Sequence, residues 1–142
     1  MSAVEWRVAV GGEETRAVYE PATSAVENAV FVCAHGAGGN MSDRSMLAAA
    51  NALRARGFGV VRFNFLYKEK GSGRPDPMPR LMDTVAAAVD RARAELEPKT
   101  LIIGGRSMGG RAASMLAESK ANVRAILNKN RAYVPKRLLQ EV

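Results

Sequence analysis

Short apolar runs alternate with amphipathic helical segments through most of this sequence, and this alternation constrains the fold more than any other feature. Ala29–Ala34 (AVFVCA), Val60–Phe65 (VVRFNF) and Thr100–Gly104 (TLIIG) are largely apolar, as expected of strands that helices cover on both faces. Val123–Leu127 (VRAIL) predicts one more strand. Because strands and helices alternate, we predict an α/β fold, a three-layer α/β/α sandwich with a mostly parallel sheet and right-handed crossovers.

We expect a helix after each of the first three apolar runs. Their apolar sides consist of Met46, Leu47, Ala50 and Leu53; of Met82, Val85, Val89, Ala92 and Leu96; and of Ala112, Ala113, Met115 and Leu116. Ser42 or Asp43 caps the first helix, and Gly57 lies where a left-handed C-terminal residue belongs.

Two further segments complete the expected organisation. Val4–Val10 and Thr15–Tyr19 are β-prone and flank Gly11 and Gly12, which predicts a hairpin at the start of the domain. Leu66–Pro79 is rich in polar residues, proline and glycine, and we expect a loop there.

The length and charge distribution indicate one domain with a basic end. At 142 residues the chain is long enough for a single core, which we place at residues 1–128, with a basic tail at 129–142. Most of the net charge of +7 lies in residues 119–142. No nucleic-acid motif accompanies this charge, so we expect a solvated terminus and no nucleic-acid binding.

Cysteine usage and hydropathy suggest where the protein resides. Cys33 is the single cysteine, so no internal disulfide forms, and its apolar surroundings suggest a small buried side chain and not a nucleophile. No apolar stretch is long enough for a membrane span, and the N-terminus lacks the pattern of a signal peptide. We expect a cytoplasmic protein that uses no cofactor and no metal.

The strongest chemical signal is Gly105-Arg106-Ser107-Met108-Gly109, a G-x-S-x-G match between a predicted strand and a predicted helix. This context is that of a nucleophile elbow, where a serine sits on a tight, strained turn and flanking glycines avoid a clash. The helix start also points free N–H groups towards developing negative charge. Two alternatives are a plain helix start capped by Ser107 and a phosphate-binding turn, although the usual phosphate motifs are absent.

A second signal follows the strand at 29–34, where His35-Gly36-Ala37-Gly38-Gly39 forms a turn. In hydrolases with a nucleophile elbow, the loop at this position donates one backbone N–H to the oxyanion hole, and the residue after the nucleophile donates the other. The candidate donors are therefore the amides of Ala37 and Met108. The alternative is a glycine-rich connection without a chemical role.

Three stretches, AHGAGG (34–39), VVRFNFLYKEKGSGRPDP (60–77) and IIGGRSMGGRAASMLA (102–117), resemble a family of small α/β-hydrolases. This dienelactone-hydrolase-like family includes bacterial alpha/beta family hydrolases and the testis-expressed protein 30 type. The resemblance implies an α/β-hydrolase fold, Ser107 as the nucleophile and hydrolysis of an ester or similar acyl bond in a small-molecule substrate. Some eukaryotic relatives act as subunits of complexes, so the resemblance also implies a binding role.

The sequence departs from this family after Ser107. A triad should continue with an acid and then a histidine, but the residues after Ser107 include no Asp and no His, and the acids there are Glu118 and Glu141. His35, the single histidine, belongs to the oxyanion loop and is expected to have a structural role rather than to act as the base. We therefore expect a fold that is incomplete at its C-terminal side and hydrolysis that is weak or absent.

Two hypotheses follow from these residues. The first is a serine hydrolase acting on a carboxylic ester, and the second is a non-catalytic binding or scaffold protein with the same fold. An exposed edge at Val123–Leu127 would offer a surface for self-association. A nucleotide-binding α/β domain is a third reading, but it lacks its phosphate motif.

Overall fold

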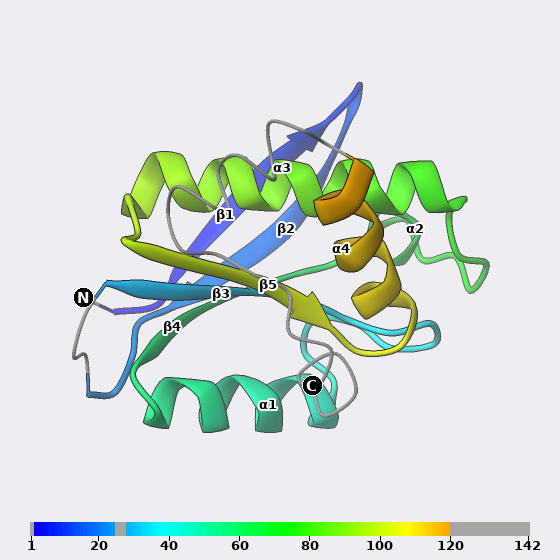
Figure 1. Ribbon diagram of the computed structural model, residues 1–142. Coiled ribbons are helices and arrows are strands. Elements are labelled where there is room, and N and C mark those ends of the chain that lie inside the picture. The colour runs from blue at the N-terminus through cyan, green and yellow to red at the C-terminus, as the bar shows by residue number, and fades with distance from the viewer. Residues whose placement is uncertain (1, 25–27, 120–142) are drawn as a thin grey trace.

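The structure of the protein is a computed structural model that describes residues 2–24 and 28–119. Within them the strands are β1 (Val4–Val10), β2 (Glu13–Glu20), β3 (Ala29–Ala34), β4 (Phe58–Phe63) and β5 (Thr100–Gly105). They form one sheet in the order β1-β2-β4-β3-β5 (Figure 1). The three strands β4, β3 and β5 are parallel, whereas β2 pairs antiparallel with both β1 and β4. The predicted α/β class and mostly parallel core are confirmed, and the β1–β2 hairpin makes the sheet mixed.

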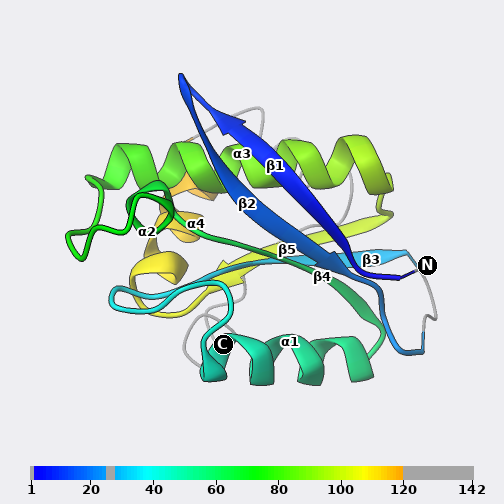
Figure 2. The same ribbon diagram turned by 180° about the vertical axis from the view of Figure 1, so that it is seen from behind.

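Helices cover both faces of this sheet. They are α1 (Arg44–Ala55), the short α2 (Leu66–Glu69), α3 (Met78–Leu96) and α4 (Met108–Ser119). Figures 1 and 2 show α1 alone on one face, with α3 and α4 together on the other. The expected three-layer arrangement is therefore present.

The two-residue period of the strands explains how one sheet serves two cores. In β3, Val30 and Val32 belong to the apolar cluster under α3 and α4, whereas Phe31 and Cys33 belong to the cluster under α1. Successive strand side chains point to opposite faces, so a strand covered on both sides must be apolar throughout. This explains why the sequence shows continuous apolar runs and no alternation with polar residues.

The hairpin and the helix ends form largely where the sequence predicts them. Val10 pairs with Glu13 across a turn in which Gly11 has a φ of 62°. Asp43, one of the two expected caps, accepts a hydrogen bond from the Met46 amide at 2.9 Å and so caps α1. Gly57, with a φ of 98°, follows the end of that helix.

Three expectations about individual segments are wrong. The strand predicted at 60–65 is β4, which covers 58–63 because it pairs with β3 from Ala29 to Ala34 and ends where β3 ends. The loop predicted at 66–79 contains α2 and the first residues of α3, because the buried side chains of Leu66 and Tyr67 anchor a helical turn. Leu47 and Met115, assigned to apolar helix sides, are 40% and 47% exposed.

Other expectations lie beyond the described residues. The predicted strand Val123–Leu127, the self-association edge built on it and the tail at 129–142 all fall there. Within the described residues, none of the helices combines the length and apolar character that crossing a bilayer requires.

Candidate active site

The G-x-S-x-G segment forms a sharp turn between β5 and α4. Ser107 lies between the last residue of β5, Gly105, and the first residue of α4, Met108, and its φ of 51° places it in the left-handed region. A residue other than glycine pays about 1–3 kcal/mol for such a conformation, so the surrounding structure must hold it. Ser107 is exposed, and its backbone is not extended as that of a capping residue would be. The turn therefore presents the Ser107 hydroxyl to solvent at the carboxyl edge of the sheet.

Two glycines allow this turn to lie directly against the end of β3. A Cβ built on Gly109 would meet the carbonyl oxygens of both Ala34 and His35, and one built on Gly105 would collide with the Ala34 carbonyl. The Arg106 amide donates to that same Ala34 oxygen at 3.0 Å, which continues the β3–β5 pairing into the turn. Only glycine permits such close approach of two backbones.

The loop after β3 faces Ser107. A Cβ built on Gly36 would lie 3.6 Å from the Ser107 Cβ and 3.1 Å from the Arg106 carbonyl oxygen. Within residues 2–24 and 28–119, the Ala37 and Met108 amides make no hydrogen bond. Gly38, next to Ala37, has a φ of 78°, which turns the loop back on itself. The structure therefore brings the predicted serine and the predicted glycine loop to one place.

His35 is a structural residue at the base of this loop. Its ring is fully buried, its Nε2 accepts a hydrogen bond from the Phe65 amide at 3.1 Å, and its Nδ1 donates to the Gly36 carbonyl at 2.9 Å. An amide N–H can only donate, so Nε2 is the unprotonated nitrogen. Burial lowers the pKa of His35 below its ordinary value. Both ring nitrogens are occupied by backbone groups, so the ring ties the loop after β3 to the loop after β4.

Polar residues outside the two sequence motifs hold the far end of the same loop. The Asn64 side-chain oxygen accepts from the Met41 amide at 2.8 Å, and Arg62 donates to the Met41 carbonyl. Arg62, which is 5% exposed, also forms an ion pair with Glu20 at 2.8 Å. The signal in the sequence was two polar residues inside the apolar run VVRFNF, because buried polar groups need partners.

Asp43 completes this support. Its carboxylate accepts from the Asn40 amide at 3.0 Å in addition to capping α1. Although burial raises the pKa of Asp43, hydrogen bonds from the Met46 and Asn40 amides and the Ser45 hydroxyl hold it below its ordinary value. An ionised Asp43 therefore joins the loop to the first turn of α1.

Two further groups bear on the chemistry of the site. Cys33 is fully buried, and burial raises its pKa to about 12, so its thiol is not ionised at neutral pH. In the part of the chain that the structure describes, no three His, Cys, Asp or Glu side chains are grouped so that they could hold a metal ion.

A serine on a strained strand-to-helix turn, opposite a glycine loop at the carboxyl edge of a sheet covered on both faces, defines the α/β-hydrolase class. A family profile described as "Alpha/beta hydrolase domain" matches residues 27–132, and the chain belongs to this family.

Known proteins extend this comparison. The chain is 37% identical over 98 residues to the uncharacterized protein YfhR of Escherichia coli O157:H7, a match that covers 68% of the chain and 32% of YfhR. The chain thus spans about a third of the length of the curated relatives that it matches.

Solved structures share the fold. The α/β serine hydrolase XC6422 from Xanthomonas campestris, described as having no lid, matches with a TM-score of 0.75 at 24% identity, over 87% of this chain and 58% of that one. Dienelactone hydrolase from Anabaena variabilis matches with a TM-score of 0.72 at 19% identity, over 87% of this chain and 61% of that one. At these identities the likeness concerns the fold alone.

Proposed function

We propose that the protein is a serine hydrolase that acts on a carboxylic ester or similar acyl bond of a small molecule, with Ser107 as its nucleophile. The observation that carries this proposal is the left-handed φ of 51° at Ser107, held between β5 and α4 with Gly36 opposite. Strain in the backbone is retained where the geometry it produces has a use. Here the strained residue is an exposed serine that lies opposite Gly36.

In this mechanism the Ser107 oxygen attacks the acyl carbon, and its proton passes to solvent water, which later returns a proton to the departing alkoxide. The carbonyl π electrons move to oxygen, and the Ala37 and Met108 amides stabilise the oxyanion. Collapse of the intermediate expels the alcohol and leaves an acyl group on Ser107, which water then removes. Donors arranged in advance for the oxyanion contribute about 3–4 kcal/mol each to lowering the barrier.

The base is not His35, because backbone groups occupy both of its nitrogens. Since His35 is the single histidine of the sequence, we expect slow hydrolysis by this chain. Oxyanion stabilisation and binding alone accelerate acyl transfer about 10³–10⁴-fold over water.

Labelling with a fluorophosphonate probe tests the role of Ser107. We expect the parent chain and a Ser114→Ala control to be labelled, because Ser114 lies on α4 away from the turn. We expect no label on Ser107→Ala, and peptide mapping should place the adduct on Ser107. Equal labelling of Ser107→Ala would refute the proposal.

The second candidate is a non-catalytic binding protein on the hydrolase fold. The observation that favours it is the full engagement of His35 in backbone hydrogen bonds, which leaves Ser107 without a histidine partner in this sequence. An unlabelled, folded parent chain that still captures a partner after Ser107→Ala would support this candidate.

A further inference from the structure

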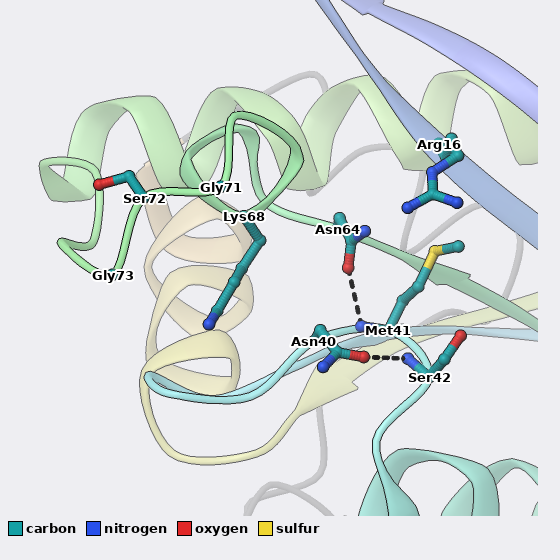
Figure 3. A pocket seen from close by; sticks show the side chains of 9 residues that line it. All are labelled: Arg16, Asn40, Met41, Ser42, Asn64, Lys68, Gly71, Ser72 and Gly73. Carbon is teal, nitrogen blue, oxygen red and sulfur yellow. Dashed lines mark hydrogen bonds between the residues drawn. The ribbon is translucent and has the colours of Figure 1, made fainter.

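A polar cavity of about 540 Å³ lies between the loop after β3 and the loop after β4 (Figure 3). Asn40 and Ser42 line it from the loop after β3. Asn64 lines it from the end of β4, Lys68 from α2 and Arg16 from β2. Among the described residues that line it, none carries a carboxylate. The cavity therefore offers cations and neutral polar groups without an acidic counterpart in its wall.

The two cations differ in how their charges are balanced. The Arg16 guanidinium pairs with Glu69 at 3.0 Å, and Glu69 also accepts from Asn64 at 2.8 Å. Although burial raises the pKa of Glu69, hydrogen bonds from Asn64 and Arg16 hold it below its ordinary value, so this carboxylate is ionised and neutralises Arg16. Lys68 is half-buried and, within the described residues, has no carboxylate within ion-pair distance. Among the described residues, the Lys68 charge therefore faces the Tyr67 ring at 5.9 Å from its centre but is uncompensated by any negative charge.

Asn40 supplies an oriented donor to the same cavity. Its side-chain oxygen accepts from the Ser42 amide at 2.8 Å, which fixes the side chain and leaves its NH₂ group to donate elsewhere. Figure 3 shows the Lys68 side chain extending from α2 towards the loop that carries Asn40. Asn64 differs, since Met41 and Glu69 occupy both ends of its amide.

The loop after β3 runs from Gly36, which lies against Ser107, to Asn40, which lines the cavity. The Gly39 amide donates to the Gly36 carbonyl at 3.0 Å, so the loop turns tightly between Gly36, which faces Ser107, and Asn40. The Lys68 Nζ lies 5.9 Å from the centre of the Tyr67 ring, and the Tyr67 and His35 ring centres are 6.2 Å apart, so this charge is near the base of the same loop. The same loop therefore borders both the cavity and the turn at Ser107.

We propose that this cavity binds an anionic group of the substrate, a carboxylate held by Lys68 and Asn40, while the ester carbonyl lies at Ser107. This inference rests on the proposed function and names its substrate class: esters that carry a negative charge on the group next to the scissile bond. One uncompensated cation matches a single negative charge, and a hydrogen bond between charged groups is stronger than a neutral one.

The test measures binding, and it uses a Ser107→Ala background so that no turnover occurs. Monomethyl succinate and the neutral dimethyl succinate are titrated by NMR into this protein and into versions that also carry Lys68→Met or Lys70→Met. Lys70 is the matched control, because it is two residues away, pairs with Glu13 at 2.8 Å and does not line the cavity. Methionine keeps the length of lysine and removes its charge.

We expect Lys68→Met to weaken monomethyl succinate binding about 10- to 100-fold, as loss of a charged hydrogen bond predicts. Lys70→Met should bind it like the background protein, and dimethyl succinate should bind weakly to all three. Added salt should weaken only the binding that depends on Lys68. An affinity that Lys68→Met leaves unchanged, or a preference for the neutral diester, would overturn the inference.

A competition experiment with inorganic phosphate distinguishes a carboxylate ligand from a phosphoryl ligand. If it displaces monomethyl succinate only at higher concentration, the carboxylate assignment is supported; if it binds more tightly and depends on Lys68, the carboxylate assignment is wrong and the cavity takes a phosphoryl group. These outcomes are independent of Ser107 chemistry, because the background lacks its hydroxyl. Failure of fluorophosphonate labelling would refute the proposed function without changing them.

Discussion

The buried ring of His35 permits a quantitative test of how the loop after β3 is held in place. The perturbation is a matched pair of substitutions, His35→Leu and His35→Gln. Leucine removes the acceptor of the Phe65 amide, whereas the glutamine side-chain oxygen can still accept from that amide. The Gly36 carbonyl keeps a partner in both variants, because the Gly39 amide also donates to it at 3.0 Å.

The magnitude follows from the group left without a partner. An unsatisfied buried N–H costs about 1–3 kcal/mol, and the lost hydrogen bond adds about 1 kcal/mol. His35→Leu should therefore lower the free energy of unfolding by about 2–4 kcal/mol, and His35→Gln by about 1 kcal/mol. Urea unfolding at about pH 8, where the histidine is neutral, measures both values.

The same pair gives a pH dependence whose sign is fixed by the structure. The pKa of His35 is lowered in the folded protein, so between that value and about 6.5 the unfolded chain binds more protons. Stability contributed by neutral His35 is complete above about pH 6.5 and is lost as the pH falls, at about 1.4 kcal/mol per pH unit until the folded pKa is reached. His35→Gln lacks this component. The reasoning is refuted if His35→Leu is no less stable than His35→Gln, or if the parent and His35→Gln lose stability in parallel on acidification.

Three further predictions concern residues around this loop. Gly109→Ala should lower the free energy of unfolding by about 3 kcal/mol, because its Cβ would meet two carbonyl oxygens. Gly12→Ala, which has open space around it, should change that free energy by less than about 0.5 kcal/mol. Equal effects in thermal or urea unfolding would contradict the close approach of the backbones at Gly109. Tyr67→Phe should leave the free energy of unfolding unchanged or raise it by up to about 1 kcal/mol, because the Tyr67 hydroxyl is buried with no hydrogen-bond partner among the described residues. A clear loss of stability would mean that the hydroxyl has a hydrogen-bond partner. Cys33 has a pKa of about 12 and is fully buried, so it should not react with Ellman's reagent in the native protein at about pH 8. It should react fully in concentrated guanidinium chloride. Rapid reaction of the native protein would show that α1 opens easily.

The sequence alone determined the class of fold and the position of its turn. Continuous apolar runs such as Ala29–Ala34 require helices on both faces of the sheet. This requirement can be predicted from the residue types of the run alone. The tight turn at Ser107 was equally predictable from the G-x-S-x-G segment, because the glycines on both sides of Ser107 indicate that larger side chains would clash there. Element ends were less accurate: β4 ends at Phe63 because its partner β3 ends at Ala34, and a single sequence does not display pairing.

What only the tertiary structure decided is which distant polar groups meet. Asn64 and Arg62 reach Met41 across 23 and 21 positions of sequence, and their roles depend on β4 lying beside β3. The fold also decides which cation of the cavity is paired. Arg16 forms an ion pair with Glu69, which is 53 positions away in sequence, whereas Lys68 pairs with no carboxylate within the described residues. Apolar burial follows from each residue's own chemistry, but hydrogen bonds and charge compensation depend on the partner, and the partner is supplied by the fold.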